Sequence, residues 1–159
     1  MATIREVFET NTFGVMAVTQ AALPRMRERR SGVIVNVTSS AVLAPMPLVA
    51  VYTASKVAIE GFTASLEHEL SGHGVRVKLV QPGYCPTTPF SSNSGSRTDG
   101  LIPEAYAGYA QEALAGFTQP AEVTKESDVA EAVWRAANDV SGQLRFPAGP
   151  DAVALARSA

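Results

Sequence analysis

Two short valine-rich runs separated by a long helical pattern constrain the fold of this 159-residue chain more than any other feature. The first run, 33–37, is apolar on both faces except at Asn36, which is typical of a central parallel strand covered on both sides. The second run, 75–80, ends at Gln-Pro-Gly, because proline cannot continue a strand ladder. The pattern between the two runs predicts one helix over about 48–73. Two strands joined by a helix predict a parallel pair.

The same alternation of helix and strand continues on both sides of this unit. Apolar residues three or four positions apart predict a helix before the first strand, with a kink at Pro24. A helix capped by Ser127 precedes a short third strand at 144–146, and we expect the tail after that strand to be weakly ordered. The whole pattern predicts an α/β fold with right-handed crossovers. In it, three parallel strands with flanking helices form a single domain over 1–159.

The composition argues against several classes of protein. A net charge of −2 provides no electrostatic basis for nucleic-acid binding, and no apolar run reaches the roughly 18 residues of a membrane span. The single cysteine, Cys85, excludes an internal disulfide and fits a reducing compartment, so we expect a cytoplasmic location. One cysteine and two histidines are too few for a zinc site, and we expect no metal.

Three residues with complementary chemistry follow the first strand. Ser39 comes directly after it, and Tyr52 and Lys56 lie four residues apart, on one face of the next helix. Pro82-Gly83 follows the second strand, so both features fall on the rim where ligands bind in parallel sheets. An ammonium beside a phenol favours the phenolate and lowers its pKa. The pair therefore suits proton transfer to or from the oxygen of a carbonyl or alcohol.

These residues and their surroundings resemble the C-terminal part of the short-chain dehydrogenase/reductase family. The matching motifs are Asn11 in Asn-Thr-Phe-Gly, the run Ile-Val-Asn-Val-Thr-Ser-Ser at 34–40, Tyr52-x-x-x-Lys56, and Gln-Pro-Gly-Tyr-Cys-Pro-Thr at 81–87. Their order and spacing match the family from residue 1 to about 150. The resemblance implies a partial Rossmann-like, doubly wound fold and an oxidoreductase that moves a hydride between NAD or NADP and a small carbonyl or alcohol substrate.

The resemblance also implies a role for each matching residue. The catalytic residues would be Asn11, Ser39, Tyr52 and Lys56. The nicotinamide end of the cofactor would be held by Tyr52, Lys56, Pro82, Gly83, Cys85 and Thr87. The loop region 84–118 would contact the substrate. Four of these positions also have a structural interpretation: Ser39 as a cap or turn of the chain, Tyr52 and Asn11 as structural residues of their helices, and Cys85 as a small packing residue.

Part of the family pattern is absent from this sequence. The chain has neither a glycine-rich phosphate loop nor the Asn-Asn-Ala-Gly signature, so it would hold only the last three strands of a seven-stranded sheet. We therefore expect weak cofactor binding, an open edge on the first strand and a homo-oligomer, either a dimer or a tetramer. Two functions remain: an oxidoreductase in a truncated form, or a non-catalytic oligomerising remnant of one. A Ser-His hydrolase is disfavoured because no Gly-x-Ser-x-Gly elbow is present.

Overall fold

The protein is built around one small parallel sheet. The computed structural model describes residues 1–90, 102–117 and 122–158. The sheet has the order β1-β2-β3, and both neighbouring pairs are parallel, as the sequence predicts. Its strands are β1 (Gly32–Val37), β2 (Val75–Pro82) and β3 (Arg145–Ala148).

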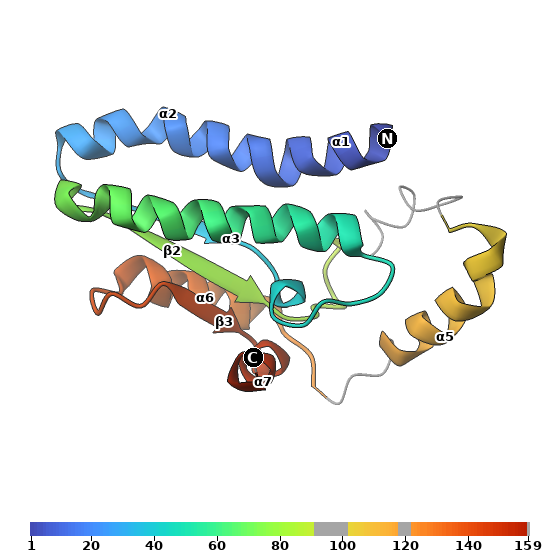
Figure 1. The fold of residues 1–159 in the computed structure, drawn as a ribbon. Helices are drawn as coiled ribbons and strands as arrows, with labels where there is room; N and C mark the ends of the chain where they lie inside the picture. The colour runs from blue at the N-terminus through green and yellow to red at the C-terminus, as the bar shows by residue number, and fades with distance from the viewer. Residues whose placement is uncertain (91–101, 118–121, 159) are drawn as a thin grey trace.

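Helices cover the sheet on two sides. Figure 1 shows α1, α2 and α3 on one side of the sheet, α6 and α7 on the other, and α5 standing apart from it. The helices are α1 (Ala2–Phe8), α2 (Gly14–Glu28), α3 (Ala50–Leu70), α5 (Ala107–Phe117), α6 (Glu126–Asn138) and α7 (Pro150–Ser158). A π-helix, η1 (Glu9–Phe13), joins α1 to α2. Short 3₁₀ turns are η2 (Ser40–Val42), η3 (Ser71–His73) and η4 (Glu104–Tyr106).

Alternate residues of β2 belong to two separate hydrophobic cores. Val75 and Val77 pack with α3, whereas Val80 packs with α6. The two helices therefore cover opposite faces, although β1, β2 and β3 follow one another in a single direction across the sheet. The crossovers through α3 and α6 consequently have opposite hands, and the expectation that both are right-handed is wrong. Residues 83–125, which include η4 and α5, separate β2 from α6, so α6 does not follow β2 directly.

α2 continues past Pro24, which lies on the exposed side one turn before the helix end, where a lost backbone hydrogen bond faces water. The irregular turn of this helical segment is the π-helix η1. Two local expectations in the C-terminal part of the chain are wrong. The tail after β3 is ordered as α7, and its Ala152 is fully buried. At the start of α6, the Asp128 carboxylate, rather than the Ser127 hydroxyl, accepts the backbone N–H of Lys125 at 2.9 Å.

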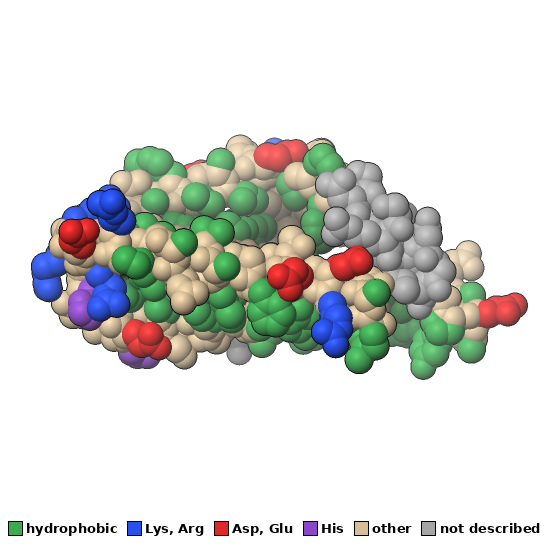
Figure 2. Space-filling view, turned by 90° about the horizontal axis from the view of Figure 1, so that it is seen from above, with side chains coloured by type: hydrophobic (Ala, Val, Ile, Leu, Met, Phe, Trp, Pro, Cys, Tyr) green, Lys and Arg blue, Asp and Glu red, His purple; other side chains and the backbone are tan. Residues whose placement is uncertain are grey.

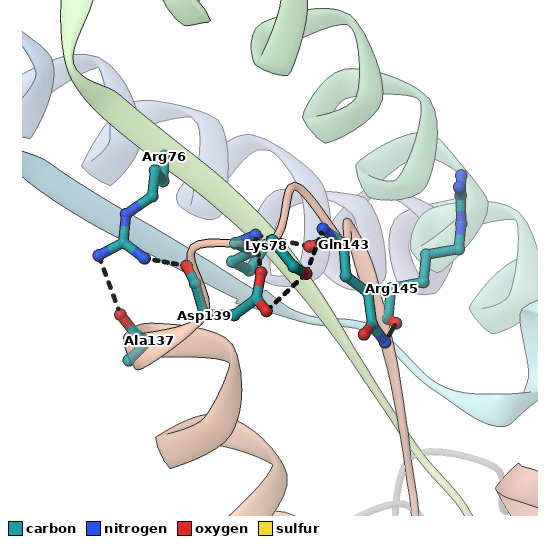
Figure 3. A network of polar contacts seen from close by, with 7 residues as sticks. Arg76, Lys78, Ala137, Asp139, Gln143 and Arg145 are labelled. Atoms are coloured by element: carbon teal, nitrogen blue, oxygen red, sulfur yellow. Dashed lines mark hydrogen bonds and ion pairs between the residues drawn. The ribbon is translucent and has the colours of Figure 1, made fainter.

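Two cations of β2 fasten the end of α6 to the sheet. The buried Lys78 ammonium donates to Asp139 Oδ1 at 2.7 Å and to the Gln143 carbonyl at 2.6 Å (Figure 3). Arg76 donates to the backbone carbonyls of Ala137 and Asp139, which lie at the helix end and lack helical partners. The hydrogen bond from Lys78, aided by one from Ser141, lowers the pKa of the Asp139 carboxyl. These contacts fix the turn from α6 into β3.

The second edge of β1 is open in the part of the chain that the structure describes. β1 pairs with β2 alone, over the register Gly32↔Val75 to Val37↔Val80. Val37, the last residue of the strand, keeps 43% of its surface exposed although it is apolar. The expected open edge is confirmed, and it lies beside the residues that follow β1.

Candidate active site

Ser39 lies where the chain leaves the carboxyl end of β1. Its backbone is extended, and it caps η2 by accepting the Ala41 N–H at its Oγ, at 3.2 Å. The turn is needed because the chain must pass from the sheet up to α3, and a small hydroxyl residue is suited to cap it. The same hydroxyl makes a hydrogen bond with the Tyr52 side chain. The structure thus brings Ser39 and Tyr52 together, as the sequence predicts.

Tyr52 is in the first turn of α3, which begins at Ala50. Burial raises the pKa of its phenol, and the hydrogen bond with Ser39 offsets part of that rise. The sequence predicts that Lys56 lowers the pKa of Tyr52. This prediction is wrong, because the net shift is upward. The Lys56 ammonium lies 5.8 Å from the centre of the Tyr52 ring, and its hydrogen bond goes elsewhere. The phenol is protonated at neutral pH, as a proton donor must be.

Lys56 lies one turn further along α3 and points back to β1. Its Nζ donates to the Val37 carbonyl at 3.2 Å. Burial lowers the pKa of this ammonium. An ammonium has three N–H donors, and this is the one hydrogen bond that Lys56 makes among the described residues. Two donors therefore remain available at the rim for hydroxyl groups of a ligand.

Asn11 reaches the site through the π-helix. The wide turn of η1 presents its amide to α3, where Nδ2 donates to Ser55 Oγ at 3.1 Å. Ser55 in turn donates to the Tyr52 carbonyl at 2.7 Å, and Thr12 donates to the Ser55 carbonyl at 3.1 Å. Asn11 therefore supports the first turns of α3, next to Lys56. π-Helical turns often occur at functional sites because they redirect side chains in this way.

The segment after β2 contains the remaining predicted residues. Pro82 is the last residue of β2, and the Gly83 N–H donates to the Ala148 carbonyl at 3.0 Å. Thr87 donates to Glu126 Oε1 at 2.7 Å, and Cys85 Sγ lies 3.9 Å from Thr87 Oγ1. The hydrogen bond from Thr87 lowers the pKa of Glu126. These residues are held toward α6 and β3 rather than toward Lys56.

This segment returns to the rim at Phe90. The Phe90 ring meets the Tyr52 ring edge to face, with 5.7 Å between their centres. An aromatic pair of this kind stabilises its geometry by about 1 kcal/mol. Phe90 therefore borders the phenol on the side of the 84–118 region, of which 91–101 and 118 lie outside the described residues.

Sequence reasoning missed Phe90 and a buried carboxylate beneath the site. Glu60 Oε1 accepts the Thr38 hydroxyl at 2.7 Å and the Gln81 amide at 3.0 Å, and Oε2 accepts Arg145 Nε at 2.9 Å. Glu60 is one turn after Lys56, so a polar residue on the buried stripe of α3 was the available signal. Thr38 precedes Ser39 and Gln81 precedes Pro82, so Glu60 holds both site segments against α3.

The donor set at the rim fits the sugar end of a nicotinamide nucleotide better than its phosphates. The Lys56 ammonium with two available donors and the Ser39–Tyr52 pair are suited to hydroxyl and carbonyl oxygens. The sequence offers no glycine-rich turn for a pyrophosphate. Over 1–90, 102–117 and 122–158, no group of three or more His, Cys, Asp or Glu side chains is placed to hold a metal. Within the same residues, no helix is long and apolar enough to cross a bilayer.

Comparison with known proteins agrees with this geometry. A family model for short chain dehydrogenases matches residues 1–99, which include Asn11, Ser39, Tyr52 and Lys56. The chain belongs to the short-chain dehydrogenase family. A relative from Schizosaccharomyces pombe, described as an uncharacterized oxidoreductase, is 34% identical over 151 residues. The match covers 92% of this chain and 61% of that relative.

Solved structures of other short-chain dehydrogenases have the same fold. One from Mycobacterium paratuberculosis, bound to NAD, has a TM-score of 0.73 at 29% identity, covering 91% of this chain and 54% of that one. One from Burkholderia cenocepacia, in complex with NADP, has a TM-score of 0.70 at 25% identity, covering 98% of this chain and 53% of that one. The chain spans 53 to 61% of the length of these three family members.

Proposed function

We propose that this chain carries the catalytic part of an NAD(P)-dependent oxidoreductase that interconverts a carbonyl and an alcohol. The observation that supports it most is the convergence of the Ser39 hydroxyl, the Tyr52 phenol and the Lys56 ammonium at the carboxyl end of β1. Family members bound to NAD and to NADP support the choice of cofactor. The single half-buried cysteine is consistent with a cytoplasmic enzyme.

Each group has a defined part in the proposed reaction. The nicotinamide cofactor, when bound, supplies the hydride for reduction or accepts it in oxidation. Ser39 donates a hydrogen bond to the substrate oxygen as charge develops there. Tyr52 gives its phenolic proton to that oxygen in reduction and takes one back in oxidation. Lys56 stabilises the phenolate formed after proton transfer and binds ribose hydroxyls with its remaining donors.

The residues around the triplet have supporting roles in this proposal. Asn11 orients α3 through Ser55 and holds a water that connects Lys56 to solvent. Pro82, Gly83, Cys85 and Thr87 form the wall that receives the nicotinamide ring. The Phe90 ring borders Tyr52. An apolar ring beside the phenol favours a small carbonyl or alcohol substrate that has an apolar substituent.

Cofactor binding separates this proposal from a non-catalytic remnant that only oligomerises. Titration with NADH and NADPH, followed by nucleotide fluorescence, is expected to show saturable but weak binding, because the phosphate-binding turn is absent from this sequence. Lys56→Met is expected to weaken the binding further, whereas Lys125→Met, which removes an exposed lysine at the start of α6, leaves it unchanged. A folded chain that binds neither nucleotide would instead support the remnant.

We further propose that the chain forms a homo-oligomer that covers β1 and the outer face of α1, η1 and α2. Phe13 is 53% exposed and Val18 is 71% exposed on this face. In the view from above, hydrophobic side chains are spread among charged ones and also line a recess (Figure 2). An open apolar strand edge and exposed apolar side chains both favour pairing with a second copy.

The oligomeric state tests this surface directly. Light scattering after size exclusion is expected to give a dimer or tetramer for the parent chain, and a shift toward monomer for Phe13→Glu combined with Val18→Glu. Val140→Glu is the control, because Val140 is 85% exposed and follows α6, a helix on the opposite side of the sheet from α1 and α2 (Figure 1). A monomer at high concentration would contradict the proposal.

A further inference from the structure

A group of contacts at the start of α7 ties three separate chain segments together. Asp151, in the first turn of α7, accepts the Tyr84 backbone N–H at Oδ2, at 2.6 Å. Its other oxygen, Oδ1, accepts the Thr124 hydroxyl at 2.5 Å. Thr124 completes the ring, because its own N–H donates to the Tyr84 carbonyl at 2.8 Å. We call Asp151, Thr124 and the Tyr84 backbone the clasp.

The clasp is closely packed, and two glycines make room for it. A Cβ on Gly83 would lie 2.1 Å from Asp151 Oδ1, and one on Gly149 would lie 1.8 Å from Thr124 Oγ1. Gly149 also has a φ of +92°, a conformation that L side chains rarely adopt. Thr124 is 1% exposed, and its hydroxyl also lies 3.0 Å from the Ala148 carbonyl. Any side chain at either glycine would displace a member of the clasp.

The clasp acts where the segment after β2 leaves the sheet. Gly83 is still bonded to β3 through the Ala148 carbonyl, and Tyr84 is the first residue beyond that ladder. Cys85 and Thr87 follow directly, and the segment reaches the Tyr52 ring at Phe90. Without Asp151, the Tyr84 N–H would lose its acceptor on α7. Residues 85–90 would then lack the hydrogen bond that fixes the chain where it leaves the sheet.

We propose that Asp151 is a positioning residue that sets the path of residues 84–88 and so the wall on which the nicotinamide ring binds. This inference rests on the proposed function, because it assigns a consequence to cofactor binding at that wall. A carboxylate is well suited to the role, since its two oxygens accept from Tyr84 and Thr124 at once. Asn at this position has one acceptor oxygen and would keep only one of the two bonds.

Amide hydrogen exchange on the full chain tests the clasp without any need for activity. In Asp151→Ala, exchange of 84–88 is expected to rise by about tenfold or more, because a hydrogen bond to a charged group is lost. Exchange of β2 at 75–80 is expected to stay unchanged, which separates a local from a global effect. Thr124→Ser, which keeps the hydroxyl, is expected to behave like the parent. Glu131→Ala is the matched control, since Glu131 is an exposed carboxylate on α6.

The same variants are then titrated with NADH. Asp151→Ala is expected to weaken NADH binding, while Thr124→Ser and Glu131→Ala retain the parent affinity. Unchanged exchange at 84–88, equally increased exchange at 75–80, or unchanged NADH affinity despite faster local exchange would each overturn the positioning role. Failure of the parent chain itself to bind NADH would overturn the proposed function, and with it the link to the nicotinamide ring. The exchange pattern would still decide whether Asp151 holds 84–88.

Discussion

Replacing Tyr52 with Phe is expected to lower turnover of a carbonyl substrate by about 10²- to 10⁴-fold, the usual contribution of a positioned proton donor. The substitution removes only the phenolic oxygen, so the edge-to-face contact with Phe90 and the start of α3 should remain. The measurement is the rate of NADH or NADPH oxidation with a simple ketone at saturating cofactor. The control is Ser65→Ala, because it removes an exposed hydroxyl on the same helix outside the site, and its rate should equal that of the parent.

The pH dependence of the same reaction reports the protonation state of Tyr52. Burial raises the pKa of the phenol, so the protonated form predominates at neutral pH. Carbonyl reduction needs this form, and its rate should fall only as the pH rises toward the elevated pKa. Alcohol oxidation needs the phenolate, and its rate should rise with pH over the same range. An unaffected rate in Tyr52→Phe, or both directions following the same pH trend, would contradict the role of Tyr52.

Replacing Glu60 with Ala is expected to lower the free energy of unfolding by about 3 kcal/mol or more. The change removes the buried acceptor of the Gln81 amide, leaves the Thr38 hydroxyl only its longer contact with the Val80 carbonyl at 3.4 Å, and opens a cavity. It also removes the partner of Arg145, whose contribution is small because its side chain is 49% exposed. Urea unfolding followed by circular dichroism gives the difference directly.

Two further variants show whether the carboxylate itself is responsible. Glu69→Ala on the same helix is the control, because Glu69 is exposed, and its stability should change by no more than about 0.5 kcal/mol. Glu60→Gln keeps an acceptor for Thr38 and should fall between the parent and Glu60→Ala. Equal stabilities of Glu60→Ala and Glu69→Ala would show that the contacts of Glu60 contribute little.

The parts of the fold that the sequence predicted are those encoded locally. The strands β1 and β2 were predicted because both runs are rich in valine and bounded by turn residues, and α3 because its apolar stripe is long. Tyr52 and Lys56 were placed together because four residues is about one helical turn. Even so, β2 extends two residues beyond its predicted end, because Gln81 and Pro82 still pair with β3.

The parts that were missed depend on contacts between distant segments. The opposite hands of the two crossovers follow from α6 packing beneath the sheet, which no local pattern encodes. α7 was missed because its order depends on Ala152 packing in the core and on Asp151 bonding to residues 67 and 27 positions away. The sequence predicted the wrong direction for the shift in the Tyr52 pKa. Burial of the phenol and the hydrogen bond from Lys56 to the Val37 carbonyl decide how far Lys56 influences the phenol, and sequence spacing reports neither.

The π-helix η1 changes which side of the first helix is presented to the rest of the molecule. A π turn holds one residue more than an α turn, and each residue rotates a helix by about 100°. The side chains of Ala2–Phe8 are thus out of phase with those of α2 by about that angle, although both run along one axis (Figure 1). Deleting one residue between 9 and 13 would restore a regular helix and remove this offset. A family member without the extra residue would align to this chain only with a gap there, and its N-terminal turns would turn a different flank to solvent.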